Sequence, residues 1–328
     1  MTQHKIAILD VWAEAVRDQT RAVAPENFEL HFAESYDEDH QIEIAQICDF
    51  IVCGTAPISR RLLDAAPNVK FIQKWGIGFD KVDLEAVRDH SLGLCNTAGA
   101  NSSVVAEHTV LLILAVYRHL LEIDTRLRNG EWLDIKIMLR NNALQMRGKT
   151  IGILGFGNIG RAVAQRLIGF ETNVIYYDIS RAAEKIERKF KASYVSLGHL
   201  LKESDILTIH TPLDESTRNI VDANAINQMK DTAIIINCAR GGVLNEKALF
   251  DAIKAGHLRG AGIDVWEPEP TEPENPLLSL DKVVVTPHAA GSAFDNVGNV
   301  SKHCFKNIQL FLDGKALPKA DVIIPIPA

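Results

Sequence analysis

Residues 149–178 read KTIGILGFGNIGRAVAQRLIGFETNVIYYD, and this stretch decides the fold. An apolar run leads into Gly155, Gly157 and Gly160, and a helix-forming run and a second apolar run follow. Gly155 permits a tight turn from strand to helix, Gly157 lets the backbone approach a pyrophosphate, and Gly160 lets the helix pack closely on the strand. Glycines also mark ordinary turns in α/β domains without a cofactor, but the flanking runs favour a dinucleotide-binding β-α-β unit.

The residues beside these glycines indicate which dinucleotide is bound. Free N–H groups at the start of the helix, at Asn158 and Ile159, are expected to hold the pyrophosphate. Asp178 ends the second strand, close to the offset of roughly 20 residues expected of a ribose-binding acid. Because its carboxylate repels a 2′-phosphate, NAD is favoured over NADP. Arg181 keeps NADP open, since a guanidinium there could reach a 2′-phosphate, although a solvated residue at a helix start is the simpler interpretation.

Short β-branched runs alternate with helix-length segments along most of the chain. This alternation is typical of parallel sheets and indicates an α/β fold. From Asn101 a long helix-forming segment reaches about Asn129 and separates two series of strands, and a further helix is expected over about 293–313, before a polar tail. The predicted strands are 5–10, 28–33, 49–54, 70–76 and 93–96 in the first series, and 149–155, 172–178, 192–196, 205–211, 232–239, 260–265 and 282–288 in the second.

Length and composition limit the function classes. A chain of 328 residues with 47% hydrophobic and 23% charged residues can bury two medium-sized cores, so we expect two domains. The formal net charge is -7, with acidic and basic residues mixed along the whole chain. Since this leaves no basic stripe for a phosphate backbone, a nucleic acid is not expected as a partner.

The cysteines and the apolar segments favour a cytoplasmic location. The five cysteines form no C-x-x-C pair and stand mostly in apolar runs, so we interpret them as reduced core thiols. The first residues enter a strand-like run at once and lack the apolar core of a secretory signal. The most apolar stretch, 109–117, is shorter than the roughly 20 residues of a membrane span. We therefore expect a cytoplasmic protein without membrane contact, and we predict no metal site.

Three residues near strand ends of the second series fit the reduction of a 2-keto acid. That reaction needs a cation for the carboxylate, an acid that protonates the developing alkoxide, and a group that keeps the acid protonated. Arg240 follows the strand 232–239, His288 ends the strand 282–288, and Glu269 lies in a proline-containing loop. Taken singly, each is as easily interpreted as structural, for example as a surface arginine or a histidine packed at a strand end.

The segments around these residues carry a family resemblance. NCARGGVLNEKAL, GIDVWEPEP and VVVTPHAAG follow GFGNIG in that order. They closely resemble the signature segments of the D-isomer-specific 2-hydroxyacid dehydrogenases, and the likeness covers nearly the whole chain. The resemblance implies that Arg240, Glu269 and His288 are the catalytic residues, and that Asp264 contacts the nicotinamide carboxamide. Glu269 matches the family's acid, which lies five positions after the Asp, whereas Glu267 does not.

The resemblance also implies a mechanism. Arg240 binds the carboxylate and the carbonyl oxygen, His288 donates a proton to that oxygen, and C4 of the nicotinamide supplies the hydride. Glu269 pairs with the imidazole and favours its charged form. The backbone N–H groups of Gly76 and Ile77 would hold the substrate carboxylate.

The family's architecture is two Rossmann-like or flavodoxin-like domains, with the NAD-binding domain inserted into a discontinuous substrate domain. For this chain the resemblance implies a substrate domain of 1–101 with 292–328 and an NAD-binding domain of 102–291. An arm over 128–142 has no place in either sheet, and a family-like homodimer would bury it. Further cofactor contacts are expected at Thr211, Pro212, Cys238 and Ala239, and with less support at His210.

The sequence leaves the substrate open. Glyoxylate, hydroxypyruvate and 3-phosphoglycerate are the candidates, whereas Glu269 argues against formate, because formate dehydrogenases of this fold lack that glutamate. Lys74 either contacts a second acidic group on the substrate or is an ordinary surface lysine. Two alternatives from other classes are a dinucleotide-sensing corepressor and an inactive NAD-binding scaffold.

Overall fold

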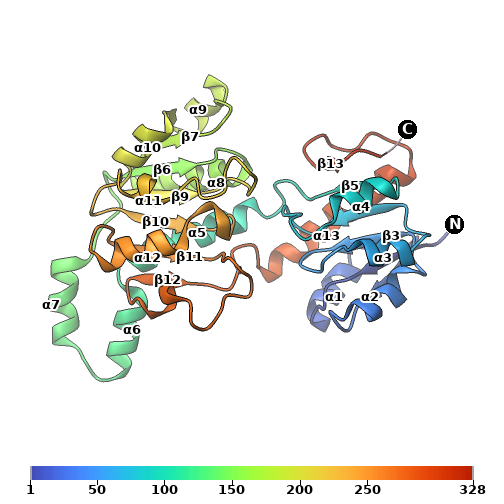
Figure 1. Cartoon of the computed structure of the whole chain (residues 1–328), viewed down its shortest axis with the longest axis horizontal. Coiled ribbons are helices and arrows are strands. Elements are labelled where there is room, and N and C mark those ends of the chain that lie inside the picture. Colours follow the sequence, from blue (N-terminus) through green and yellow to red (C-terminus); the bar gives the residue numbers. More distant parts are fainter. Residues whose placement is uncertain (1, 327–328) are drawn as a thin grey trace. The chain divides into compact units, whose positions relative to one another are not determined.

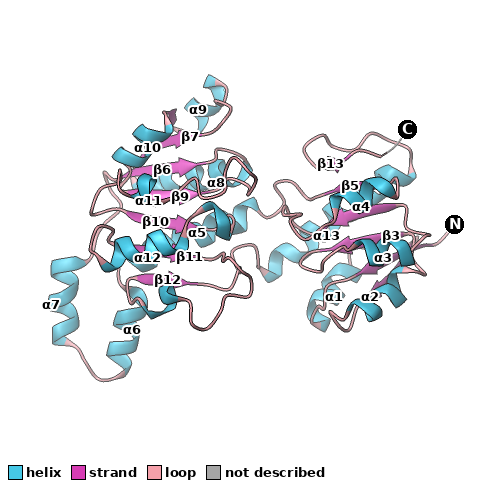
Figure 2. Cartoon of the chain, viewed as in Figure 1, coloured by secondary structure: helices cyan, strands magenta, loops and turns pink. Residues whose placement is uncertain are grey.

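The computed structural model describes residues 2–326. It divides the chain into two units (Figure 1). Unit 1 consists of Met1–Asn101 together with Ser292–Ala328, and unit 2 is the continuous segment Ser102–Gly291. Each unit is built on its own sheet (Figure 2), so the two are described separately.

Unit 1 contains a six-stranded sheet in the order β13-β5-β4-β3-β1-β2. All neighbouring strands are parallel except β13, which pairs antiparallel with β5. The strands are β1 (His4–Ile8), β2 (Phe28–Phe32), β3 (Phe50–Cys53), β4 (Phe71–Lys74), β5 (Gly93–Cys95) and β13 (Val322–Ile324), and the helices are α1 (Glu14–Arg21), α2 (Glu38–Ala45), α3 (Arg60–Ala65), α4 (Leu84–Asp89) and α13 (Val297–Leu312).

The two faces of this sheet bury separate apolar layers, because side chains alternate along each strand. In β1, Ala7 faces the layer that contains α2, α3 and α4, whereas Ile6 and Ile8 face the layer that contains α13. Helix α13 comes from the far end of the chain, yet Cys304 and Phe305 lie in the same core as the first strand. In Figure 1 its red ribbon accordingly lies among the blue elements of unit 1.

Unit 2 contains a seven-stranded sheet in the order β12-β11-β10-β9-β6-β7-β8, and all neighbouring strands are parallel. Its helices form both faces, with α5 and α8 on one and α10, α11 and α12 on the other. The strands are β6 (Thr150–Leu154), β7 (Asn173–Tyr177), β8 (Ala192–Tyr194), β9 (Ile206–Ile209), β10 (Ile234–Asn237), β11 (Gly260–Ile263) and β12 (Val283–Val285), and the helices are α5 (Ser102–Tyr117), α6 (Leu120–Arg128), α7 (Leu133–Asn142), α8 (Asn158–Leu167), α9 (Glu184–Phe190), α10 (Leu197–Glu203), α11 (Ala223–Ile226) and α12 (Glu246–Lys254).

The strand order of unit 2 reverses at β6. From this strand the chain continues to β7 and β8 on one side and then returns to β9 on the other. In doubly wound sheets ligands bind beyond the carboxyl ends of the strands at such a switch point. The predicted α/β fold class is confirmed. A ligand of unit 2 is expected at the carboxyl ends of β6 and β9, where the switch point lies.

Two elements differ from the prediction, and the structure shows what the predicted arm contains. The segment 101–129 forms two helices and not one, because His119 adopts a left-handed conformation with φ of 53° and α5 meets α6 at a bend of 60°. The polar tail contains β13, which the sequence pattern does not reveal. The arm over 128–142 is largely α7, which extends with α6 away from the sheet (Figure 2).

No single helix within residues 2–326 has the length and apolar composition needed to cross a membrane, and only the bent pair α5 and α6 meets both criteria together.

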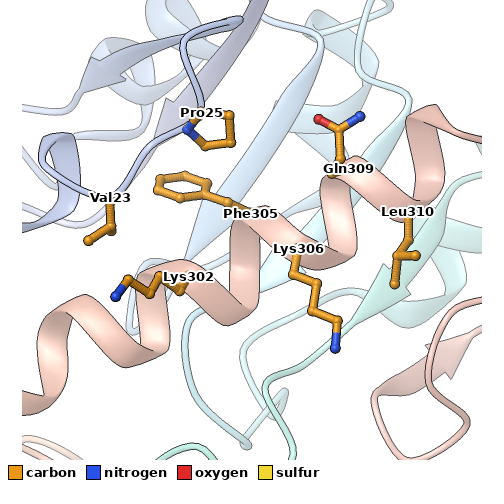
Figure 3. A pocket seen from close by; sticks show the side chains of 7 residues that line it. All are labelled: Val23, Pro25, Lys302, Phe305, Lys306, Gln309 and Leu310. Atoms are coloured by element: carbon orange, nitrogen blue, oxygen red, sulfur yellow. The ribbon is translucent and has the colours of Figure 1, made fainter.

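A shallow hollow of about 320 Å³ lies on unit 1, between α13 and the residues that follow α1 (Figure 3). Its lining is mostly apolar and includes Val23, Pro25 and Phe305. None of the residues predicted to bind cofactor or substrate lines it, so the hollow is not the candidate site.

Candidate active site

The glycine turn between β6 and α8 has the geometry of an anion cradle. Gly155 has φ of 92°, and a Cβ there would lie 2.7 Å from the carbonyl carbon of His210. A Cβ on Gly160 would lie 2.2 Å from the carbonyl oxygen of Gly155, whereas one on Gly157 meets nothing within 4 Å. Packing thus requires glycine at 155 and 160. Gly157 leaves open space beside the N–H groups of Asn158 and the following residues. These first N–H groups of an α-helix have no partners within the helix. These features fit the pyrophosphate of a dinucleotide.

Asp178 lies beside this turn at the end of β7. Its carboxylate accepts hydrogen bonds from the N–H groups of Phe156, at 2.7 Å, and Ser180, at 3.0 Å. Arg181 is turned to Glu187, with two contacts of 2.9 Å, so its guanidinium already has a bidentate acidic partner. Arg181, the residue that kept NADP open as a cofactor, is therefore already paired with an acid inside unit 2.

His210, Thr211 and Pro212 follow β9 at the switch point. The backbone N–H of His210 donates to the carbonyl oxygen of Leu154 at 2.7 Å and joins this turn to β6. Both ring nitrogens of His210 are buried and have no hydrogen-bond partner among residues 2–326. Burial lowers the pKa of His210 to about 3, so its imidazole is neutral near neutral pH.

Arg240 follows β10, after the buried Cys238 and Ala239. The side chain of Asn237 shapes this turn, because it donates to the carbonyl oxygen of Arg240 at 2.9 Å and accepts from the N–H of Ala239 at 3.0 Å. A Cβ on Gly241 would lie 2.2 Å from the carbonyl group of Trp266, so the glycine after Arg240 lets two turns of unit 2 pack together.

His288 and Glu269 are in direct contact. Nδ1 of His288 lies 2.8 Å from one carboxylate oxygen of Glu269 and 3.0 Å from the other. Glu267 is turned elsewhere and contacts Arg218 at 2.7 Å. The imidazole of His288 remains 46% exposed, so it is open to a ligand and to solvent protons.

Asp264 supports the turn that carries His288. Its side chain has no exposed surface, and its oxygens accept hydrogen bonds from the Thr286 hydroxyl at 2.6 Å and from the N–H groups of Ala289 and Ala290 at 2.8 and 2.9 Å. Its carbonyl oxygen accepts from the N–H of His288 at 2.6 Å. The resemblance implies that Asp264 contacts the nicotinamide, but in this structure its carboxylate is used inside unit 2.

Gly76 and Ile77 lie in unit 1, just after β4. Gly76 has φ of 131°, and its N–H donates to Oγ1 of Thr97 at 3.0 Å. The carbonyl oxygen of Ile77 accepts from Asn96 at 3.0 Å, whereas the Ile77 N–H has no partner among residues 2–326. Of the two N–H groups expected to hold a carboxylate, only that of Ile77 is therefore available without a rearrangement.

Lys74 is not an ordinary surface lysine. It is only 2% exposed, and its ammonium group donates to the carbonyl oxygen of Gly54. It therefore stabilises the loop after β3 and does not reach the surface.

Sequence reasoning missed two residues near the site. His108 lies in α5, and its Nε2 lies 3.1 Å from the Thr286 hydroxyl. Ile179 follows Asp178 and is 91% exposed, which is unusual for a large apolar side chain. An apolar residue directly after the ribose-binding acid is a signal that the sequence already contained. Among residues 2–326, no group of three or more His, Cys, Asp or Glu side chains is placed to hold a metal ion.

Comparisons with known proteins agree with this geometry. Residues 110–290 match the model of the D-isomer specific 2-hydroxyacid dehydrogenase, NAD binding domain family. The chain is 35% identical over 278 residues to a glyoxylate reductase of Korarchaeum cryptofilum, covering 84% of this chain and 83% of that protein. It is 38% identical over 263 residues to a hydroxypyruvate reductase of Thermotoga maritima, covering 79% and 83%.

A solved structure is also similar over almost the whole chain. It is the NAD-dependent formate dehydrogenase from Staphylococcus aureus in complex with NAD, with a TM-score of 0.84 and 28% sequence identity. The match covers 98% of this chain and 99% of the other.

Proposed function

Because this chain belongs to the D-isomer-specific 2-hydroxyacid dehydrogenase family, we propose that His288, Glu269 and Arg240 carry out its chemistry. The protein is an NAD-dependent oxidoreductase that acts on the CH–OH group of 2-hydroxy acids. The observation that carries the proposed roles is the contact of 2.8 Å between Nδ1 of His288 and Glu269. A carboxylate can only accept, so it keeps a proton on Nδ1 and leaves Nε2 as the atom that exchanges protons with the substrate.

The proton transfer follows from this arrangement. In the reducing direction Nε2 of His288 donates its proton to the oxygen of the substrate as the carbonyl becomes a hydroxyl. In the oxidising direction the neutral Nε2 accepts the hydroxyl proton. Arg240, at the end of β10, supplies a fork of N–H groups for the carboxylate and the carbonyl oxygen. We extend the proposal to unit 1, where the N–H of Ile77 would contact the carboxylate.

The cofactor supplies the hydride when it is bound, and the chain's own residues hold it in place. The open side of Gly157 and the first N–H groups of α8 fit the pyrophosphate. Asp178 would accept hydrogen bonds from the ribose hydroxyls, and the exposed side chain of the adjoining Ile179 would pack against the adenine. The remaining proposed cofactor contacts are Gly155, Asn158, Ile159, Thr211, Pro212, Cys238 and Ala239. Asp264 would contact the cofactor only after giving up a hydrogen bond inside unit 2.

We propose glyoxylate or hydroxypyruvate as the substrate, because two relatives that share 35% and 38% of their aligned residues with this chain are named for these acids. We further propose that the protein is a homodimer that uses the apolar side chains of α6 and α7. A cytoplasmic location is supported by the five cysteines, which are all buried and unpaired, as expected in a reducing compartment.

The site assignment is tested with His288→Ala and a matched pair of glutamate variants. His288→Ala is expected to lower kcat by roughly 100-fold or more with glyoxylate or hydroxypyruvate, because general acid catalysis is lost. Glu269→Gln is expected to lower kcat at least about 10-fold, whereas Glu267→Gln keeps kcat near the wild-type value. Oxidation of NADH is followed by absorbance, with 3-phosphoglycerate assayed in the reverse direction and NADPH as the alternative cofactor. Near-normal turnover by His288→Ala would overturn the assignment.

A further inference from the structure

His108 contacts the segment that carries His288, although it lies on another element. It stands in the second turn of α5, and its Nε2 lies 3.1 Å from Oγ1 of Thr286 and 3.6 Å from the carboxylate of Asp264. Its side chain is only 15% exposed. Helix α5 is thereby joined by a polar contact to the chain just before the proposed acid–base residue.

The direction of these hydrogen bonds can be assigned. The Thr286 hydroxyl lies 2.6 Å from the carboxylate of Asp264, which can only accept, so the hydroxyl proton is donated to Asp264. A hydroxyl has one proton, and Thr286 must therefore accept from His108. This requires a proton on Nε2 of His108, whatever the charge of the ring.

The end of this series of hydrogen bonds is the backbone at His288. Three successive N–H groups, those of His288, Ala289 and Ala290, donate to the carbonyl or carboxylate oxygens of Asp264 at 2.6, 2.8 and 2.9 Å. His288 has φ of 53°, a left-handed conformation that a residue with a side chain adopts only when its surroundings hold it there. The orientation of the Asp264 carboxylate therefore decides where the imidazole of His288 lies.

We propose that His108 is a positioning residue for His288, acting through Thr286 and Asp264. The proposal rests on the acid–base role given to His288 above. Loss of the donor at His108 frees the Thr286 hydroxyl to rotate, which weakens its bond to Asp264 and loosens the left-handed turn. A displacement of about 1 Å at the reacting group is enough to lower a rate by around 100-fold.

A role in docking α5 alone would not account for this contact. The helix is held by its buried apolar residues, among them Val105, Leu112 and Ile113, which pack in the core of unit 2. These contacts are unchanged by a substitution at His108. Stability and turnover are therefore expected to respond differently to the same variant.

The test compares His108→Leu with His108→Gln. The leucine lacks a donor and is expected to lower kcat by about 10- to 100-fold, with the KM for NADH changed less than about 2-fold. Glutamine carries an amide N–H close to the position of Nε2 and is expected to restore most of kcat. His199→Leu, the same change at an exposed position of α10, serves as the control and keeps wild-type kinetics.

A double-variant cycle completes the experiment and does not depend on one variant folding well. Thr286→Val is expected to lower kcat at least as much as His108→Leu, because it also removes the hydrogen bond to Asp264. The double variant is expected to be no worse than Thr286→Val alone, because His108 acts only through Thr286. Additive losses, equal losses for leucine and glutamine, or a wild-type kcat for His108→Leu would each overturn the proposal. Parallel assays of His288→Ala distinguish failure of the His108 proposal from failure of the site assignment, because activity retained by His288→Ala would contradict the acid–base role of His288 itself.

Discussion

His210 and His288 both follow strands of unit 2 and differ in their surroundings. The imidazole of His288 is 46% exposed and contacts Glu269, whereas the ring nitrogens of His210 are buried without a partner among residues 2–326. Burial penalises a charged ring and lowers the pKa of His210 to about 3. Only His288 therefore has the solvent access and the orienting acid that proton exchange with a substrate requires.

This difference predicts how stability depends on pH. The pKa of His210 is about 3 when folded and about 6.5 when unfolded, so below pH 6.5 the unfolded chain binds the extra proton. The free energy of unfolding then falls as pH falls, by about 2 kcal/mol from this group between pH 7 and pH 5. Urea denaturation at both pH values measures this loss of unfolding free energy. In His210→Gln the loss between pH 7 and pH 5 is expected to be smaller by the same amount, about 2 kcal/mol. An equal loss in the variant would contradict the buried, neutral state of His210.

The places of Arg240 and His288 at strand ends were predictable from the sequence, whereas their roles were implied only by the family resemblance. Arg240 and His288 follow strands, and the ends of parallel strands meet at one edge of a sheet. Glu269 was distinguished from Glu267 only through the family spacing, because the contact of Glu267 with Arg218 spans 49 positions. The contact of His108 with Thr286 spans 178 positions and left no local pattern to detect.

At the level of elements, the turn from β6 to α8 is where sequence and structure agree most closely. Each of its three positions requires glycine for a different physical reason, and substitution by alanine, which adds one methyl group, distinguishes these reasons. Gly160 is limited by the backbone of Gly155, and Gly157 is limited only by the proposed ligand.

Alanine variants of these glycines are expected to behave differently. Gly160→Ala forces the α8 backbone away from Gly155 and is expected to lower the free energy of unfolding by about 1–3 kcal/mol. Gly157→Ala, whose Cβ meets no protein atom, is expected to keep the stability but to weaken NADH binding at least about 10-fold, because the methyl group takes the space of the pyrophosphate. Urea denaturation and NADH fluorescence titration measure the two effects. Unchanged NADH affinity in Gly157→Ala would place the pyrophosphate elsewhere.

The elements that escaped prediction are set by tertiary contacts. The break between α5 and α6 depends on the left-handed conformation of His119, and the residues around it, YRHLLE, are ordinary helix formers. Strand β13 is three residues long and is fixed by its antiparallel pairing with β5. Propensity is a weak prior for elements that short, so neither feature was readable locally.

For the whole molecule, the main unexplained feature is the group of exposed apolar side chains in α6, in α7 and at Trp132, just before α7. Leu121, Trp132, Leu133 and Ile137 are 53%, 65%, 67% and 51% exposed. Monomeric proteins rarely expose apolar patches of this kind, which supports the proposed homodimer.

Light scattering coupled to size exclusion tests that proposal. The wild-type chain is expected to elute with the mass of a dimer, and Leu133→Lys combined with Ile137→Lys is expected to give a monomer, because burial of two ammonium groups is unfavourable. Ile47→Lys, at an exposed apolar position of unit 1, serves as the control and leaves the mass unchanged. A wild-type mass of one chain would contradict the dimer.

The sequence pattern separated two series of strands but did not establish that the last helix returns to the first series. That return is carried by the apolar face of α13, with Val300, Cys304 and Ile308 buried in the core of unit 1. The partner strands of this face lie more than two hundred positions earlier, and pairings over such separations leave no periodicity in the chain. The family resemblance was needed to expect it.

This return orders the events of biosynthesis. Unit 2 is continuous, so all of its strands are synthesised before α13. Until then, the face of β1, β3 and β4 that carries Ile6, Phe50 and Phe71 lacks the apolar side chains of α13 that complete its core. The segment translated first is thus the last to complete its core. Until α13 is added, its exposed apolar face is a surface that chaperones can bind.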